Sequence, residues 1–164
     1  MNQTKSGTFR DFLEFFPEIE LPITLNDEIH HLFSSQNKPI HPLLIEKFIL
    51  PLEGPQDGLN EFIACFKIPE THQFHAIVYW AAGITGYTYK LVTFTKEGHL
   101  IDNKVIAGTF FDGNQLTQSI ATIDPDWEIF VATGQSGQTI DQFNPSQSKA
   151  FQLELLPDGY ISQP

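Results

Sequence analysis

Two groups of ionisable residues are the first candidates for chemistry in this chain of 164 residues. His72 and His75 lie three positions apart before an apolar run, and Asp124, Asp126 and Glu128 alternate by two. Zinc needs three or four converging ligands, and side chains an odd number of positions apart in a strand point to opposite faces. The histidine pair therefore predicts no metal site.

The three carboxylates could present oxygen ligands on one side of an extended segment, which is the chemistry that calcium prefers. Pro125 favours a β-turn at this point instead, and the run lacks the glycine and the distal glutamate of an EF-hand loop. We therefore expect neither a metal ion nor another cofactor.

The sequence contains no catalytic signature. The Gly-rich stretch Gly134–Thr139 lacks the lysine of a phosphate-binding loop and the second glycine position of a nucleophile elbow. Ser/His/Asp triads occur in any chain order, and 20 acidic residues will produce chance pairs of carboxylates. No catalytic residue is predicted, and an enzyme is the less favoured interpretation.

Aromatic residues around the segment 82–86 are the best candidates for a binding surface. Tyr79, Tyr87 and Tyr89 combine a wide apolar contact area with a polar tip, which is typical of interfaces and ligand sites. The same residue types also fill cores. On strand alternation Trp80 shares a face with Phe74 and Val78, so we expect its side chain to be buried.

Net charge restricts the classes of partner. Nine Lys and Arg against 20 Asp and Glu give a charge of −11 at pH 7, and no two basic residues are adjacent. Nucleic acids and anionic membranes are bound through clustered cations, so neither is an expected partner. The N-terminal carboxylates Asp11, Glu14, Glu18 and Glu20 predict a surface for a basic protein, besides the solubility that net charge provides.

The single cysteine and the N-terminus indicate the cellular compartment. Cys65 lies within an apolar run, so we expect a buried thiol and no internal disulfide. The first residues lack the apolar core of a signal peptide, and no stretch approaches the roughly 20 apolar residues that span a bilayer. We therefore expect a soluble, cytoplasmic protein.

The elements that must position these residues change type near residue 60. In the first part Thr8 and Asp11 resemble a capping box at the start of a helix, and Pro17 is predicted to end that helix. The segment 18–23 is predicted to be an extended arm. Short helices are predicted by their apolar spacing at three places, 9–16, 29–33 and 42–48, and the apolar run of the third is also compatible with a strand. The Pro- and Gly-rich segment 51–58 is predicted to be a loop.

From residue 62 the apolar period falls to two, which is typical of strands. Strands separated by Gly- and Pro-containing turns are predicted at 62–68, 74–82, 87–95, 100–101, 105–111, 116–123, 127–133 and 149–156. The polar stretch 134–147 is predicted to be the longest loop. We expect an α+β fold with short N-terminal helices packed on a twisted, mainly antiparallel β-meander of about six to eight strands.

We expect one domain, 1–164, with a helical or irregular part at 1–58 and an antiparallel sheet at 60–164. The preferred function is a non-catalytic protein-binding module, immunity- or inhibitor-like, that recognises a basic partner. One alternative is a small-molecule binder or hydrolase with a pocket between the sheet and the 134–147 loop. Another is a structural subunit that pairs through a sheet edge. A carboxylate in contact with a histidine in a cleft would favour the former, and an exposed apolar sheet face or edge the latter.

Overall fold

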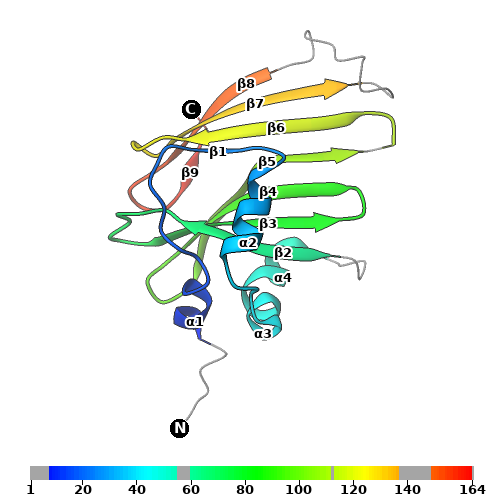
Figure 1. The fold of residues 1–164 in the computed structure, drawn as a ribbon. Coiled ribbons are helices and arrows are strands. Elements are labelled where there is room, and N and C mark those ends of the chain that lie inside the picture. Colours follow the sequence, from blue (N-terminus) through cyan, green and yellow to red (C-terminus); the bar gives the residue numbers. More distant parts are fainter. Residues whose placement is uncertain (1–7, 55–59, 112, 137–148, 164) are drawn as a thin grey trace.

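The structure, a computed structural model, describes residues 8–54, 60–111, 113–136 and 149–163. Within these ranges its main element is a nine-stranded sheet in which β2 to β9 pair in chain order (Figure 1). The strands are β2 (Glu61–Lys67), β3 (His75–Gly83), β4 (Gly86–Phe94), β5 (Leu100–Phe111), β6 (Leu116–Ile123), β7 (Glu128–Ser136), β8 (Lys149–Leu155) and β9 (Ile161–Ser162). β1 (Ile23–Leu25) pairs antiparallel with β6. The predicted α+β meander is confirmed.

Five short helical segments accompany the sheet in the described part of the chain: α1 (Phe9–Leu13), α2 (Ile29–Gln36), α3 (Pro42–Leu44), the π-helical turn η2 (Ile45–Ile49) and α4 (Leu50–Glu53). The predicted start of α1 is confirmed, because Thr8 Oγ1 accepts a hydrogen bond from the Asp11 amide at 3.0 Å. No helix in these ranges is long and apolar enough to cross a membrane.

Helical structure continues through Glu53, three residues into the segment 51–58 that was predicted to be a loop. Pro51 is compatible with the first turn of a helix, where the amide needs no intrahelical acceptor. Proline has no N–H to donate to the preceding turn, so the series of helical backbone hydrogen bonds is interrupted at Pro51. The preceding turn, Ile45–Ile49, has the wider π-helical form. The remainder of the predicted loop, 55–59, lies outside the described residues.

Helices cover both faces of the sheet, and side-chain alternation along β3 separates two cores. Val78 and Trp80 belong to the first core, together with Phe33 of α2. Ile77 and Tyr79 belong to the second core, which is closed by α1, α3 and η2. β3 is therefore buried on both faces, as its sequence predicts.

Packing of α1 fixes the chain that follows it. The rings of Phe9 and Phe94 are 5.0 Å apart between centroids, and those of Phe12 and Phe48 are 4.9 Å apart. After α1 the Lys67 amide donates a hydrogen bond to the Pro17 carbonyl at 2.8 Å, and Glu18 forms a parallel bridge with Lys67. The arm predicted at 18–23 thus runs along the end of β2.

Two strand boundaries differ from the prediction. β5 runs without a break across residues 102–104, because their polar side chains are compatible with a ladder in which they pair with Leu91, Val92 and Thr93. β7 continues to Ser136, since Gly134 pairs with Gln118 in the ladder, so the predicted loop 134–147 begins too early. The rest of that loop, 137–147, lies outside the described residues.

Candidate functional site

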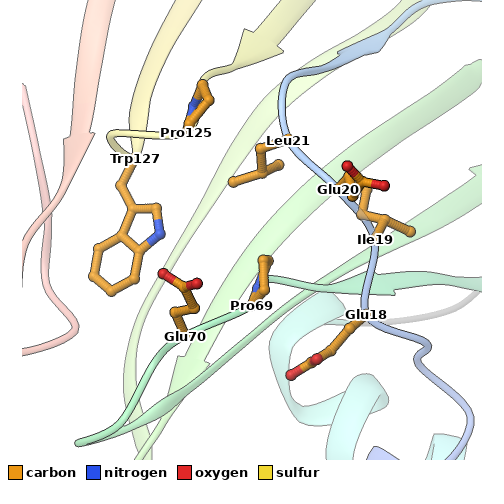
Figure 2. A pocket seen from close by; sticks show the side chains of 8 residues that line it. All are labelled: Glu18, Ile19, Glu20, Leu21, Pro69, Glu70, Pro125 and Trp127. Carbon is orange, nitrogen blue, oxygen red and sulfur yellow. The ribbon is translucent and has the colours of Figure 1, made fainter.

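Three segments that are distant in the sequence enclose a hollow of about 450 Å³ at one end of the sheet (Figure 2). They are the arm at 18–21, the turn after β2 and the turn between β6 and β7. We call this site the acidic hollow, and its lining residues are Glu18, Ile19, Glu20, Leu21, Pro69, Glu70, Pro125 and Trp127.

The turn that carries Trp127 is closed by Asp124. Its Oδ1 atom accepts hydrogen bonds from the amides of Asp126 and Glu128 at 2.9 and 3.0 Å, and its carbonyl accepts one from the Trp127 amide at 3.0 Å. The Asp124 carboxylate therefore stabilises a β-turn. Within the described ranges no group of three or more His, Cys, Asp or Glu could hold a metal ion.

Two residues of the hollow adopt a backbone conformation that is uncommon for any residue other than glycine. The φ angle is 65° at Glu70 and 68° at Trp127. Such conformations cost free energy and persist where the surrounding structure enforces them. Both residues belong to the lining of the hollow.

The Trp127 indole packs against the first core. It is half-buried, and its ring meets the edge of Phe74 with the centroids 5.8 Å apart and the planes at 77°. The Trp127 carbonyl accepts a hydrogen bond from the Leu155 amide at 3.0 Å. Ile19 and Leu21 also line the hollow and pack against the first core, so part of the lining is apolar.

Three residues that line the hollow carry exposed carboxylates. Glu18 and Glu20 come from the arm, and the Glu70 side chain extends towards the side where Trp127 lies (Figure 2). Across the described residues, none of the three forms an ion pair. The Glu70 carboxylate therefore lies beside the Trp127 ring, and the carboxylates of Glu18 and Glu20 lie on the arm across the hollow (Figure 2).

The structure unites only two of the four acidic residues that the sequence singles out. Glu18 and Glu20 line the acidic hollow, whereas Glu14 lines a separate hollow beside Lys38. Asp11 is half-buried at the start of α1, and its Oδ2 atom is buried without a hydrogen-bond partner in the described part of the chain. Sequence reasoning missed Glu70 and Trp127, for which the only signal is their position in Pro-containing turns.

Two of the three candidate tyrosines lie in the cores. Tyr79 and Tyr89 are fully buried, and burial raises the pKa of both phenols. The Tyr79 hydroxyl donates to Glu53, and the Tyr89 hydroxyl donates to the Asn26 carbonyl at 2.9 Å. Neither ring can contact a partner in the folded protein, so we leave both out of the proposed contact surface.

Tyr87 belongs to a polar cluster around Asp27. The Tyr87 hydroxyl and the Thr109 hydroxyl donate to Oδ1 of Asp27, the latter at 2.7 Å, and the Gln118 amide donates to Oδ2. Burial raises the pKa of Asp27, but these hydrogen bonds outweigh burial and hold the pKa below its ordinary value. Burial and the bond to Asp27 raise the pKa of Tyr87 to about 12.

A histidine lies beside this cluster and interacts with the backbone of Asp27. The His30 ring stacks on Trp80 with the centroids 4.5 Å apart and the planes within 4°, and burial lowers the pKa of His30. In the described ranges no hydrogen bond joins the His30 ring to the Asp27 carboxylate. A nucleophile or acid-base pair would need such a contact. The cluster thus attaches the start of α2 to the sheet.

Trp80 is 7% exposed and Cys65 is fully buried, as the sequence predicts for both. Burial raises the pKa of the Cys65 thiol, so the thiol stays protonated.

A further hollow, of about 470 Å³, lies on β6, β7 and β8. We call it the apolar face, and its lining residues are Ile120, Thr122, Phe130, Val131, Ala132, Ala150, Phe151 and Gln152. Large hydrophobic side chains are exposed here, at 38% for Ile120 and 45% for Phe130.

Comparison with known proteins finds no matching family model, and it finds no significant match among curated proteins or solved structures.

Proposed function

We propose that this chain is a non-catalytic protein-binding module that recognises a basic segment of a partner, in the manner of an immunity or inhibitor protein. The observation that supports this most is the acidic hollow, whose lining combines Glu18, Glu20 and Glu70 with apolar residues, and in the described structure these glutamates form no ion pairs of their own. An arginine or lysine side chain of the partner would supply the missing positive charge.

The chemistry of the hollow suits a long basic side chain. A guanidinium forms paired hydrogen bonds with carboxylates, and its methylene stem packs on apolar surface. A cation near the Trp127 ring would gain about 0.5–2 kcal/mol from the ring quadrupole, depending on how far it is desolvated. The carboxylates of the arm and of Glu70 would then lie around the charged end.

The size of the hollow sets its role within a larger interface. A volume of about 450 Å³ accommodates one or two side chains, whereas stable protein interfaces bury on the order of 1,600 Å². The hollow would therefore be the anchor of the contact, and the surrounding acidic surface would steer the approach of the partner. The net charge of −11 favours such steering.

The small-molecule or hydrolase alternative has less support. Its strongest candidate is Asp27, but both oxygens of that carboxylate already accept hydrogen bonds from neighbouring side chains. The pocket expected beside the 134–147 loop falls mostly outside the described residues.

Affinity capture from the source cells at low and high salt tests the proposal. The wild-type chain should retain a basic protein that high salt releases, and the triple variant Glu18→Lys, Glu20→Lys, Glu70→Lys should not retain it. A matched control is Glu28→Lys, Glu46→Lys, Glu97→Lys, which changes three exposed glutamates elsewhere by the same charge. If both triple variants lost the captured protein equally, net charge alone would explain the retention, and a binding site at the hollow would be contradicted.

A further inference from the structure

The lining of the acidic hollow offers hydrogen-bond acceptors and apolar surface but no cation. In the described structure its eight residues include three glutamates and no Lys, Arg or His. Two of the others, Pro69 and Pro125, have no backbone N–H to donate. A ligand that matches this lining must therefore bring both positive charge and hydrogen-bond donors.

The carboxylates reach the hollow from two directions. Glu70 lies in the turn after β2, beside Trp127, whereas Glu18 and Glu20 lie on the arm across the hollow (Figure 2). A lysine ammonium is a compact point charge that pairs with one such group at a time. A guanidinium carries five N–H donors that point outwards in one plane, so it can donate to Glu70 and to the arm together. The two-sided arrangement favours arginine.

Trp127 adds a second distinction between the two basic side chains. Its half-buried indole packs against the first core and also lines the hollow. A guanidinium stacks on an aromatic plane and is weakly hydrated, so it loses little on leaving water for a lining that is partly apolar. An ammonium is strongly hydrated and has no plane with which to stack.

We propose that the acidic hollow binds an arginine side chain of the partner and discriminates against lysine. The inference rests on the proposed function, because it names the residue type that the hollow takes from a basic segment. Glu70 and the carboxylates of the arm accept hydrogen bonds from the guanidinium, whose plane stacks on Trp127. Lysine carries the same charge, so the discrimination arises from the direction of the donors and from stacking.

The two tryptophans provide a readout at the hollow itself. The chain contains only Trp80 and Trp127, so a proton–nitrogen correlation spectrum of the labelled full chain has two indole N–H signals. Trp80 is buried in the first core, whereas Trp127 lines the hollow. Trp127→Phe assigns the signals by removing one of them. Movement of the Trp127 signal with an unchanged Trp80 signal therefore reports binding at the hollow of a folded chain.

Titration with capped pentapeptides Gly-Ser-Xaa-Ser-Gly, in which Xaa is arginine, lysine or citrulline, tests the selection. The arginine peptide should move the Trp127 signal with a dissociation constant at least ~5-fold below that of the lysine peptide. The citrulline peptide, which has a similar shape without the charge, should not move it. Asymmetric dimethylarginine keeps the charge but blocks paired hydrogen bonds, so its peptide should bind more weakly than the arginine peptide.

A variant of the hollow tests which acceptor creates the preference. Glu70→Gln should weaken binding of the arginine peptide more than that of the lysine peptide, because it removes the charged acceptor beside the ring. The ratio of the two dissociation constants should therefore fall towards one. Glu97→Gln is the matched control, because Glu97 is exposed and lies outside the hollow, and it should leave the ratio unchanged.

Two results would overturn the inference. Equal dissociation constants for the arginine and lysine peptides would show that the hollow reads charge alone, and a Trp127 signal that the arginine peptide does not move would show that the hollow takes no arginine. Neither result decides the proposed function, because affinity capture could still retain a basic protein through its lysines or through other acidic surface. The peptides need no natural partner, so the two experiments fail separately.

Discussion

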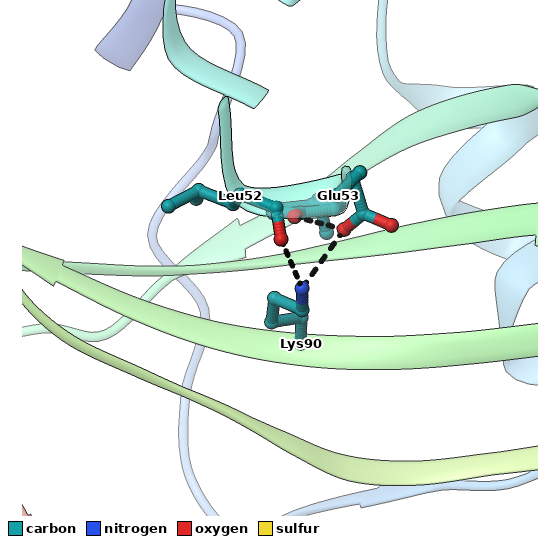
Figure 3. A network of polar contacts seen from close by, with 4 residues as sticks. Leu52, Glu53 and Lys90 are labelled. Carbon is teal, nitrogen blue, oxygen red and sulfur yellow. Dashed lines mark hydrogen bonds and ion pairs between the residues drawn. The ribbon is translucent and has the colours of Figure 1, made fainter. Parts of the chain in front are cut away.

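The Nζ atom of Lys90 lies 3.1 Å from Oε2 of Glu53, and this ion pair attaches α4 to the middle of the sheet (Figure 3). Only 10% of the Lys90 side chain and 16% of the Glu53 side chain are exposed. Nζ also donates to the Leu52 carbonyl at 3.1 Å, and the Tyr79 hydroxyl donates to the same carboxylate. Each buried charge is therefore matched by an opposite charge and a further hydrogen bond.

Removing one member of this pair should be more harmful than removing both. Lys90→Met and Glu53→Leu should each lower the free energy of unfolding by about 3 kcal/mol, because each leaves the other charge buried without its counterion. The double variant should lose much less than the sum of the two, since apolar side chains of similar volume replace the pair. Urea denaturation of the three variants and the wild type measures this, and additive losses would contradict the coupling.

The contrast between this pair and the strands shows what the sequence could predict. The alternation of apolar residues is a local signal, and it correctly predicted the burial of Trp80 and Cys65 and most of the strands. Glu53 lies 37 positions from Lys90, in a segment whose proline and glycine indicate a loop, so no local signal connects the two. Such contacts depend on how α4 packs on the sheet.

The same limit applies to the candidate site. Tyr79 and Tyr87 have the same residue type and lie in neighbouring strands, yet one is fully buried under helices and the other only partly. Sequence alternation separates the two faces of a strand but does not show how completely each face is covered. Glu70 and Trp127 meet the arm only in the folded chain, which is why the sequence identified Glu18 and Glu20 without them.

Acid should weaken the attachment of α2 through Asp27. The folded state holds the pKa of Asp27 below its ordinary value of 3.8, so the cluster stabilises the fold above that pH and loses this effect as the pH falls through the folded-state pKa. Asp27→Asn should therefore be less stable than the wild type at neutral pH, and the difference should shrink in strong acid. Urea denaturation across this pH range is the measurement. A difference independent of pH would show that the charge of Asp27 is not involved.

The β4–β5 ladder should depend on a glycine at 108. A Cβ atom there would lie 2.4 Å from the Tyr87 carbonyl oxygen, and the φ angle is 153°. Gly108→Ala should therefore separate the strands that carry Tyr87 and Thr109 and lower the stability by more than about 2 kcal/mol. Gly113 has a φ of 99°, and no atom of the described residues lies within 4 Å of where its Cβ would be, so Gly113→Ala should cost only about 1–2 kcal/mol. Thermal denaturation compares the two, and equal losses would contradict the close-contact argument.

Charge at the acidic hollow should control how fast a basic partner associates. Reversing Glu18, Glu20 and Glu70 together should slow association and flatten its dependence on salt, because these carboxylates create the local attractive field. Charge reversal at Asp11 and Glu14, which lie outside the hollow, should have a smaller effect. Stopped-flow or surface-based kinetics with the captured partner measure the rates. Unchanged association in all of these variants would contradict recognition through the acidic surface.

Trp127 should instead control how long the complex lasts. Its indole contributes contact area and attraction at short range, which act once the partner is seated and therefore influence dissociation. Trp127→Ala should raise the dissociation rate about tenfold with little change in the association rate. Trp127→Phe should recover part of the loss, because the smaller ring can still pack near Phe74. If Trp127→Ala instead slowed association as the charge reversals do, the role of Trp127 would be to hold the turn in shape and not to contact the partner. A measurement of the stability of each variant separates these two roles.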